Sequence, residues 1–438
     1  MPRYHKHCHK HLSVFQSGLT YLLLTVILMI CASTSSTASS LYSRQYKVSC
    51  AACHSAPPQL NIFGLRFRQT NSLPNWESFT SVDTGDDNTA VPSVFPFSVR
   101  SQMLGQLRRG KYFSDISTGE VANESNFDLQ MPNYIKLISS APLTENISFY
   151  FDAILKPGEN EGAISLRESW LRYRVEDGII ATLTAGQFPS ADVIVDQDTR
   201  LSLKEYLIYR QSGLGLDQGI RADIDVLDII FSLGLSNGSD ANPGKEMNSA
   251  GLGRQDRIFD NNNRKTVYGY AAKRFNTFKT GGFWQLNQQF AADGPLGNQV
   301  SDRVIFQTSY GFDIQAFPTS RISWMAQIIW NKWSEYLEKG TNIQWYGGFL
   351  GIDYRASDSI AYSLLYNYSN PGDFTNTGTI YEGLAANTVT TTLSYYFRSN
   401  VRGLLEITMD FLPQENDADF VGHETKEDAI IIGIDINY

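Results

Sequence analysis

Apolar residues between positions 95 and 438 alternate with polar ones at a period of two, and no long stretch has the 3.6-residue period of an amphipathic helix. The alternating segments are rich in Tyr, Phe, Trp, Val, Ile and Thr, which strands favour. They lie near 94–106, 124–139, 145–156, 162–176, 178–189, 201–211, 214–223, 225–236, 264–274, 279–291, 301–315, 320–333, 342–355, 358–370, 386–398, 400–412 and 426–438. Segment 201–211 belongs to a loop or to the strand after it. The pattern therefore predicts about 16 strands, an even number, as in bacterial outer-membrane barrels.

The connections between these segments alternate in length. Short turns are predicted at 141–144, 176–178, 317–319, 356–358 and 398–400, and long polar connections at 107–123, 190–200, 237–263, 371–385 and 413–425. Outer-membrane barrels have short periplasmic turns at one end and long extracellular loops at the other. A soluble β-sandwich does not need so regular an alternation. We therefore predict an all-β transmembrane barrel of about 16 antiparallel strands over residues 94–438.

Two segments have faces that suit a barrel wall. In the last one, Ile430, Ile432, Ile434, Ile436 and Tyr438 share a lipid-compatible face, and a terminal strand that ends on an aromatic residue is similar to the recognition signal of barrel assembly. In segment 166–174, Glu168, Trp170, Arg172 and Arg174 share a face that mixes charged and aromatic side chains. Arg near the bilayer midplane costs about 2–4 kcal/mol, so this mixed face is expected to line the lumen. There it either holds a plug by charge or is ordinary lumen lining.

The N-terminus has the pattern of a secretory signal peptide. A basic stretch precedes an apolar run at 19–32, and small residues follow at 33–40, so residues 1–38 are expected to be removed. The alternative is a retained membrane anchor. Residues 1–38 carry three positive charges and no negative ones, so cleavage would change the formal charge from −9 to −12. An acidic chain of this kind argues against nucleic acid as a partner and allows attraction of small cations.

The strongest chemical motif is Cys50-Ala51-Ala52-Cys53-His54, a C-x-x-C-H sequence typical of c-type haem attachment. The thiols of Cys50 and Cys53 would form the two thioether bonds, and His54 would bind the iron as the proximal ligand. The alternatives are a redox dithiol, which should begin a helix in a βαβ unit, and half of a zinc site, which needs about four ligands. No βαβ pattern follows the motif, which argues against the redox dithiol. Residues 39–438 contain no other Cys and one other His, His423, which argues against the zinc site.

We expect residues 39–93 to form a small monohaem module. Arg44, Lys47, Arg66 and Arg68 are either partners for the haem propionates or solvated charges, and Phe63, Leu65 and Phe67 could cover a haem face. The sixth iron ligand is not assigned, because residues 39–94 contain neither Met nor a second His. A ligand from the barrel would be one of Met103, Met131, Met325 or Met409, depending on strand facing. The position is equally consistent with water or with no ligand.

The run Ser43–Ala56, with Gln59-Leu60, Phe63-Gly64 and Leu73-Pro74-Asn75-Trp76, resembles the outer-membrane cytochrome–porin fusions of iron-oxidising bacteria. The resemblance implies one covalent haem c in a module that plugs the barrel lumen or lies at its mouth. It also implies an Fe(II) oxidase that passes electrons across the outer membrane to a periplasmic c-type cytochrome or blue-copper protein. Carboxylates at 413–419 could concentrate Fe(II), or form an ordinary acidic loop. The competing functions are a passive porin with a structural or sensory haem, and a haem redox protein for another small molecule.

Overall fold

A computed structural model describes residues 41–69, 95–115, 120–156, 164–176, 179–190, 194–195, 198–237, 265–293, 299–375, 384–412 and 427–438. The predicted signal peptide at 1–38, His423 and the acidic loop at 413–425 lie outside these residues. None of the described helices is long and apolar enough to cross a membrane.

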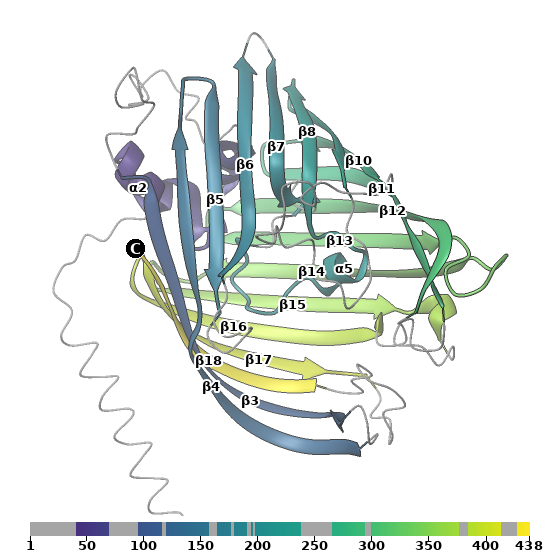
Figure 1. Cartoon of the computed structure of the whole chain (residues 1–438). Coiled ribbons are helices and arrows are strands. Elements are labelled where there is room, and N and C mark those ends of the chain that lie inside the picture. Colours follow the sequence, from purple (N-terminus) through teal and green to yellow (C-terminus); the bar gives the residue numbers. More distant parts are fainter. Residues whose placement is uncertain are drawn as a thin grey trace, which may run out of the picture. The chain divides into compact units, whose positions relative to one another are not determined.

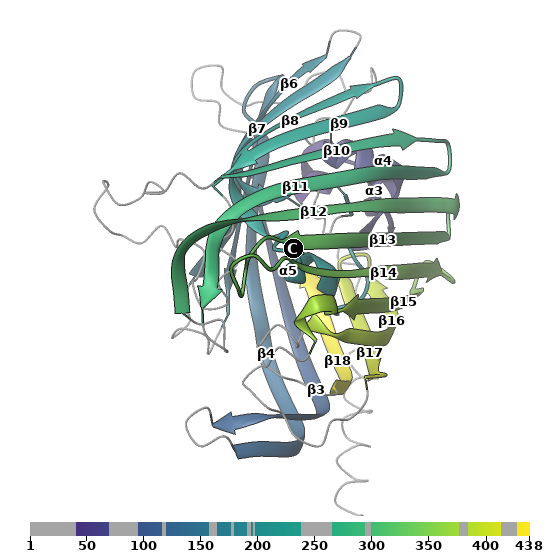
Figure 2. The same ribbon diagram turned by 90° about the vertical axis from the view of Figure 1, so that its right-hand side faces the viewer.

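Sixteen antiparallel strands form a closed barrel, as the sequence predicted (Figures 1 and 2). They are β3 (Phe97–Asp115), β4 (Glu120–Pro142), β5 (Ile147–Leu155), β6 (Ile164–Glu176), β7 (Ile180–Pro189), β8 (Leu216–Val226), β9 (Ile229–Ser236), β10 (Thr266–Arg274), β11 (Phe278–Asp293), β12 (Gln299–Thr319), β13 (Ile322–Trp333), β14 (Ile343–Arg355), β15 (Ile360–Asn370), β16 (Ala386–Arg398), β17 (Val401–Asp410) and β18 (Glu427–Asn437). Each strand pairs with its neighbours in sequence, and β18 pairs with β3 to close the ring.

One of the predicted connections was wrong, and the segment left open between a loop and a strand belongs to a loop. The region 107–123 is mostly strand, because β3 and β4 stay paired as far as Asp115 and Glu120. A hairpin that extends beyond the rest of the barrel wall can consist of polar residues. Polarity alone therefore did not mark where β3 and β4 end. Segment 201–211 is not a strand; it belongs to the connection between β7 and β8 and contains the short helix α5 (Leu207–Gln211).

The two faces of the wall differ in chemistry. On β14, Leu350 and Ile352 are exposed, whereas Phe349 and Asp353, which flank them, are buried inside. Ile430, Ile432 and Ile434 are exposed on the outer face of β18 and Tyr438 directly after it, as the alternation predicted, while Ile436 is half-buried. Glu168, Trp170, Arg172 and Arg174 of β6 are buried on the inner face, which confirms that prediction too. The barrel therefore has an apolar exterior and a polar interior, which suits a lipid surround.

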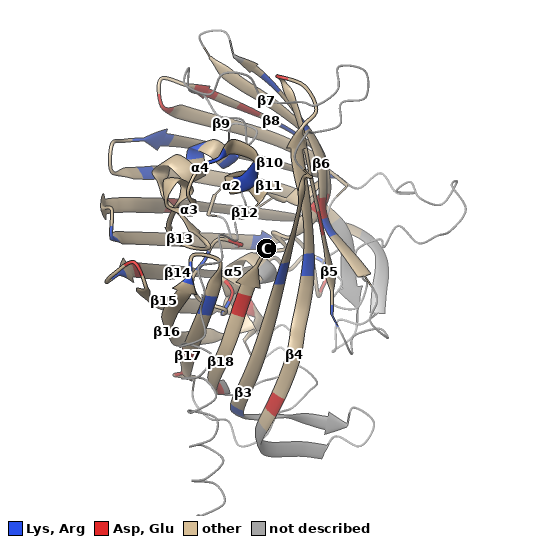
Figure 3. Cartoon of the chain, turned by 90° about the vertical axis from the view of Figure 1, so that its left-hand side faces the viewer, with Lys and Arg blue, Asp and Glu red and all other residues tan. Residues whose placement is uncertain are grey.

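Residues 41–69 form a compact N-terminal segment with three helices and one small hairpin. Its elements are α2 (Leu41–Tyr46), α3 (Cys50–Cys53), β1 (His54–Ala56), β2 (Gln59–Leu60) and α4 (Ile62–Gln69). Basic positions occur on α2 and α4, and residues 41–69 contain no Asp or Glu (Figure 3). The segment lies at the barrel end with the short turns: Tyr42 Oη donates to Ser140 Oγ, 3.0 Å away near the β4–β5 turn, and Tyr396 Oη donates to the Pro57 carbonyl (2.6 Å) near the β16–β17 turn.

The described part of the β7–β8 connection (194–195 and 198–215), here called the inward loop, folds into the lumen. Lys279 Nζ and Gln315 Nε2 donate to the Ile194 carbonyl over 2.9 and 2.6 Å, and α5 packs on β14 and β15. Leu201 and Tyr209 are almost fully buried. A polar connection, which is normally a solvated surface element, is here a core element of the barrel.

The two-faced wall makes a matched pair of substitutions informative. Ile432, near the middle of β18, is 61% exposed on the outer face, whereas Ile431 lines the lumen cavity described below. Arg at a lipid-facing midplane position costs about 2–4 kcal/mol. Ile432→Arg should therefore lower the free energy of unfolding in lipid vesicles by about that amount, measured by urea titration of tryptophan fluorescence. Ile431→Arg should cost clearly less. Equal losses would show that residue 432 does not face lipid.

Candidate functional site

The two cysteines of the motif occupy one helical turn. α3 spans Cys50 to Cys53, and both are partly buried free thiols. Burial, followed by the nearby Cys50, raises the pKa of the Cys53 thiol above its ordinary value. A redox dithiol depends on a lowered thiol pKa. The raised pKa of the Cys53 thiol therefore argues against the dithiol alternative, and the two thiols lie one helical turn apart.

His54 is oriented by two backbone carbonyls. Its Nδ1 lies 3.0 Å from the Pro58 oxygen and 3.3 Å from the Gln59 oxygen. A carbonyl can only accept a hydrogen bond, so Nδ1 carries the proton and Nε2 keeps its lone pair. Burial lowers the pKa of His54, and the two carbonyl bonds oppose this without reversing it. The imidazole is thus held neutral with Nε2 ready to bind a metal, the form and second-shell partner typical of a ligating histidine.

A side chain that sequence reasoning missed, Asn61, fixes the geometry around the motif. Its Nδ2 donates to the Ala52 carbonyl over 2.9 Å, and its Oδ1 accepts the Gly64 N–H at 2.8 Å. Asn61 therefore caps the start of α4 and ties α4 to α3 at the same time. The sequence did contain a signal for this cap, because Asn61 precedes an apolar stretch, and Asn is a preferred residue at the N-terminal end of a helix.

Gly64 allows the close approach of α4 to the motif. A Cβ at this position would lie 2.1 Å from the Cys53 carbonyl oxygen and 2.9 Å from the Leu60 side chain. Only glycine fits there without moving the backbone of the motif. The Phe63-Gly64 pair thus has a packing reason that the sequence alone did not disclose.

An aromatic cluster supports the other side of the segment. Phe67 is buried and makes edge contacts with Tyr42 and Tyr46, with ring centroids 5.3 and 5.7 Å apart, and it stacks near Phe63 at 6.5 Å. Phe63 and Phe67 thus pack within this cluster, while Leu65 lines a small cavity against the barrel wall. Whether any of the three covers a haem face remains a prediction.

Hydrogen bonds join the segment to the barrel at several points. Gln59 Nε2 donates to Ser323 Oγ and, over 2.5 Å, to Asp353 Oδ2. Arg172 is on the face predicted either to hold a plug by charge or to be ordinary lumen lining, and it donates to the carbonyl of Arg68 over 2.8 Å. Arg44 likewise donates to a backbone carbonyl, that of Phe97. These contacts hold the segment at the short-turn end through hydrogen bonds to its backbone and from the side chains of Gln59 and Arg44.

The strand faces separate the four candidate methionines. Met103, Met131 and Met409 are 38%, 61% and 45% exposed on the outside of the barrel. Met325 is on the inner face of β13 and lines the small cavity with Leu60 and Leu65 of the N-terminal segment. Of these four, Met325 alone faces the segment.

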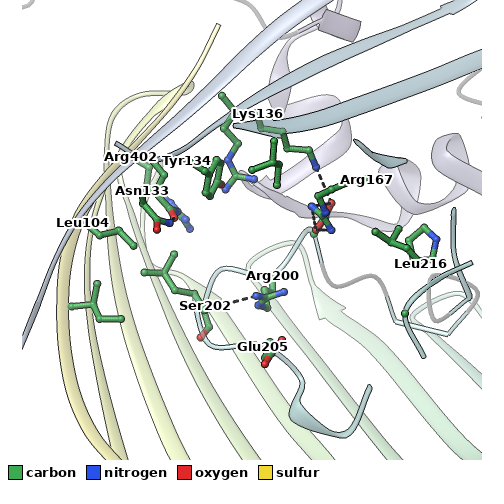
Figure 4. Close-up of a pocket in the computed structure, with 18 of the residues that line it drawn as sticks. Leu104, Asn133, Tyr134, Lys136, Arg167, Arg200, Ser202, Glu205, Leu216 and Arg402 are labelled. Atoms are coloured by element: carbon green, nitrogen blue, oxygen red, sulfur yellow. Dashed lines mark hydrogen bonds and ion pairs between the residues drawn. The ribbon is translucent and has the colours of Figure 1, made fainter. Parts of the chain in front are cut away.

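A larger cavity of about 570 Å³ lies in the lumen beside the inward loop (Figure 4). Asp198 of the loop lies 3.0 Å from Lys136 Nζ and 3.2 Å from Arg167 Nη1. Although burial opposes the shift, Lys136 and Arg167 hold the pKa of the Asp198 carboxyl well below its ordinary range. Arg100 and Arg402 share Asp435, at 2.5 and 3.2 Å. The charged lining is largely paired within itself.

One group of carboxylates in the described residues has the spacing of a metal site. Asp152, Glu168 and Asp198 offer oxygens within 4.8 Å of one another. The ammonium group of Lys136, however, lies 2.5 Å from Asp152 and 3.0 Å from Asp198. A lysine cation already neutralises this group, so it is a buried ion-pair network rather than an iron cage.

The similarities to known proteins concern the barrel. No protein-family model and no curated protein matches the chain. The structure resembles OmpF of Salmonella typhi, solved in complex with daunomycin, at 13% identity, 78% coverage of this chain, 97% coverage of that chain and a TM-score of 0.51. It also resembles an anion-selective porin from Comamonas acidovorans at 10% identity, with 78% and 98% coverage and a TM-score of 0.51. The chain therefore has the fold of the outer-membrane porins, and the cytochrome part of the predicted family resemblance stays a prediction.

Gly64→Ala tests the close packing of the motif. The added Cβ would overlap the Cys53 carbonyl oxygen, so the N-terminal segment should lose about 1–3 kcal/mol of stability. Hydrogen exchange and limited proteolysis of residues 41–69 should both become faster. The control is Gly215→Ala, where a Cβ meets no atom within 4 Å. Equal protection in wild type and Gly64→Ala would contradict this packing.

Glu406→Ala tests the attachment of the inward loop. The Glu406 side chain is 1% exposed. It accepts hydrogen bonds from Ser202 Oγ (3.0 Å), Leu203 N–H (2.6 Å) and Lys204 N–H (3.1 Å). Its removal takes from the Leu203 N–H the acceptor that it has here, at about 1–3 kcal/mol, whereas Lys204 N–H and Ser202 Oγ keep a hydrogen bond to each other. Single-channel conductance in planar bilayers should rise or fluctuate more.

The exposed Glu338, replaced by Gln, is the matched control for Glu406. It should leave the conductance unchanged. Identical conductance traces for wild type and Glu406→Ala would show that Glu406 does not hold the inward loop in the lumen.

Proposed function

We propose that this chain is an outer-membrane barrel that carries one covalent haem c at its short-turn end. It takes electrons from Fe(II) outside the cell and passes them to a periplasmic c-type cytochrome or blue-copper protein. The observation that carries the proposal is the arrangement of Cys50, Cys53 and His54. Two free thiols lie one turn apart, and the next residue is a neutral imidazole whose Nε2 keeps its lone pair.

The electron balance of this function is simple. Each Fe(II) loses one electron and becomes Fe(III), and the periplasmic acceptor gains that electron. A haem bound through Cys50, Cys53 and His54 would supply the one-electron couple between them. Because Fe(III) precipitates readily near neutral pH, oxidation outside the cell keeps the mineral outside.

The position of the motif supports a periplasmic acceptor. The short turns of outer-membrane barrels face the periplasm, and the N-terminal segment is bound at that end through Gln59, Tyr42 and Pro57. A carrier on the periplasmic side would therefore meet the segment directly. The electron from the donor has to cross the lumen, or Fe(II) has to enter the lumen from the long-loop end.

The second candidate is a passive porin whose haem is structural or sensory, and the likeness to solved porins favours it. In that case the cavity beside the inward loop is part of a solute path. A third candidate is a haem redox protein that acts on another small molecule. The three functions share the barrel and the motif, and they differ in whether Fe(II) reduces the protein.

Anaerobic mixing of the purified ferric holoprotein with Fe(II) separates these functions. Under the main proposal the haem absorbance bands change rapidly to those of the reduced form. His54→Ala should bind haem through Cys50 and Cys53 but lose this reduction. A wild-type protein that stays oxidised in excess Fe(II) over a wide pH range refutes the iron-oxidase function. Solute conductance without reduction would support the porin.

A further inference from the structure

The charge of the N-terminal segment is opposite to that of the chain as a whole. Residues 41–69 contain Arg44, Lys47, Arg66 and Arg68 but no Asp or Glu, whereas the whole chain has a formal charge of −9. Arg44, Lys47 and Arg66 are exposed, and basic positions on α2 and α4 are visible in Figure 3. The segment thus presents positive charge at the barrel end with the short turns, which faces the periplasm in outer-membrane barrels.

Two of these cations lie on neighbouring parts of the segment. Lys47 directly follows Tyr46, the last residue of α2. Arg66 directly precedes Phe67 of α4. The rings of Tyr46 and Phe67 are in edge contact, with their centroids 5.7 Å apart. This contact holds the end of α2 against α4, and so it brings the positions of Lys47 and Arg66 close together.

Exposed apolar side chains lie next to these cations and to the cysteine motif. Ile62, the first residue of α4, is 41% exposed, and Ala51 of the motif is exposed as well. Their neighbours in the chain hold them together, because Asn61 Nδ2 donates to the Ala52 carbonyl over 2.9 Å. Ile62 and Arg66 are four residues apart on α4 and therefore share one face of that helix. A small apolar centre beside the motif is thus bordered by positive charge.

We propose that Lys47, Ala51, Ile62 and Arg66 form a basic docking surface for the acidic face of a soluble periplasmic electron carrier. This inference rests on the proposed function, because the partner is the carrier that accepts the electron. In the transfer itself, a ferrous haem bound at the motif loses one electron and the oxidised carrier gains it. No proton and no chemical group has to move.

The chemistry of this surface suits a partner that binds briefly. Opposite charges steer two proteins together and raise the rate of association. Weak electron-transfer complexes bury less than about 1,200 Å² of surface, so a small contact is sufficient. The limited apolar area around Ile62 gives contact close to the motif without making dissociation slow. A carrier with a basic face would be repelled by Lys47 and Arg66.

Anionic lipid headgroups also bind basic surfaces, but the contacts of the segment favour a soluble partner. Gln59 and Tyr42 bind Asp353 and Ser140, which are buried inner-face residues of the barrel. The segment is therefore attached to the inner face of the wall and not to the face that contacts lipid. Its exposed cations are accordingly placed at the end of the barrel.

Binding of probe proteins tests the inference without an activity assay. The holoprotein is placed in phosphatidylcholine nanodiscs, and the probes are plastocyanin, an acidic blue-copper protein, and a basic mitochondrial cytochrome c. Microscale thermophoresis should show that plastocyanin binds at low ionic strength and more weakly as salt is added. Lys47→Glu and Arg66→Glu should each weaken this binding by about threefold or more. Neither substitution should weaken the binding of the basic cytochrome.

The matched control is Lys339→Glu, the same change of charge at an exposed residue between β13 and β14, at the opposite end of the barrel. It should leave plastocyanin binding unchanged. Ile62→Ser should weaken the binding and keep its salt dependence. Heat-modifiable migration in gels confirms that each variant folds.

The inference is overturned if plastocyanin does not bind, or if Lys47→Glu and Lys339→Glu have equal effects. It also fails if phosphatidylglycerol in the nanodiscs abolishes the difference between wild type and Lys47→Glu, because lipid headgroups then cover the surface. Failure of the proposed function is seen separately, as absence of a porphyrin in mass spectrometry or absence of reduction by Fe(II). The binding measurement requires neither of these.

Discussion

The hydrogen-bond ladder between β18 and β3 is the contact on which the rest of the structure depends. Eleven residue pairs, from Glu427–Gly110 to Asn437–Arg100, join the last strand to the first. In a lipid surround an open sheet edge would leave a row of backbone groups without partners, each costing several kcal/mol. Closure removes that edge and divides every strand into an outer and an inner face. The outer face is then restricted to apolar side chains, whereas the inner face is free to carry polar groups.

The inner face uses this freedom to bind two parts of the same chain. Side chains from β11, β12, β15 and β17 hydrogen-bond to the inward loop through Lys279, Gln315, Asn367 and Glu406. Ser323, Asp353 and Tyr396 bind the N-terminal segment near the short turns. Most of these bonds reach backbone atoms or uncharged groups, and charges such as Asp198 and Asp435 are shared between two cations. The wall therefore holds both parts mainly through hydrogen bonds, and the Asp198 and Asp435 charges within it are paired.

The barrel and the motif point to function in different ways. The porin-like fold is shared by proteins of many specificities, and fold alone does not define a reaction. The motif is local chemistry: two free thiols one helical turn apart and an imidazole whose Nδ1 proton is held by a backbone carbonyl. Their combination in one chain, with the motif at the short-turn end, is the basis on which electron transfer across the membrane is proposed here, whereas the barrel alone is equally suited to diffusion of solutes.

The sequence by itself determined the barrel, because a two-residue period with an apolar outer face follows directly from lipid on one side and water on the other. It also indicated that Cys50, Cys53 and His54 belong to one site, since they are close together in the chain. Polarity misplaced the ends of β3 and β4 and left segment 201–211 unassigned, because a polar stretch suits a loop, a long hairpin or a lumen insert equally well. Only the tertiary structure showed that Met325 faces the N-terminal segment and that Asn61 and Gly64 hold α4 against the motif. These contacts join residues through strand facing and side-chain direction, which register and closure decide and which composition does not encode.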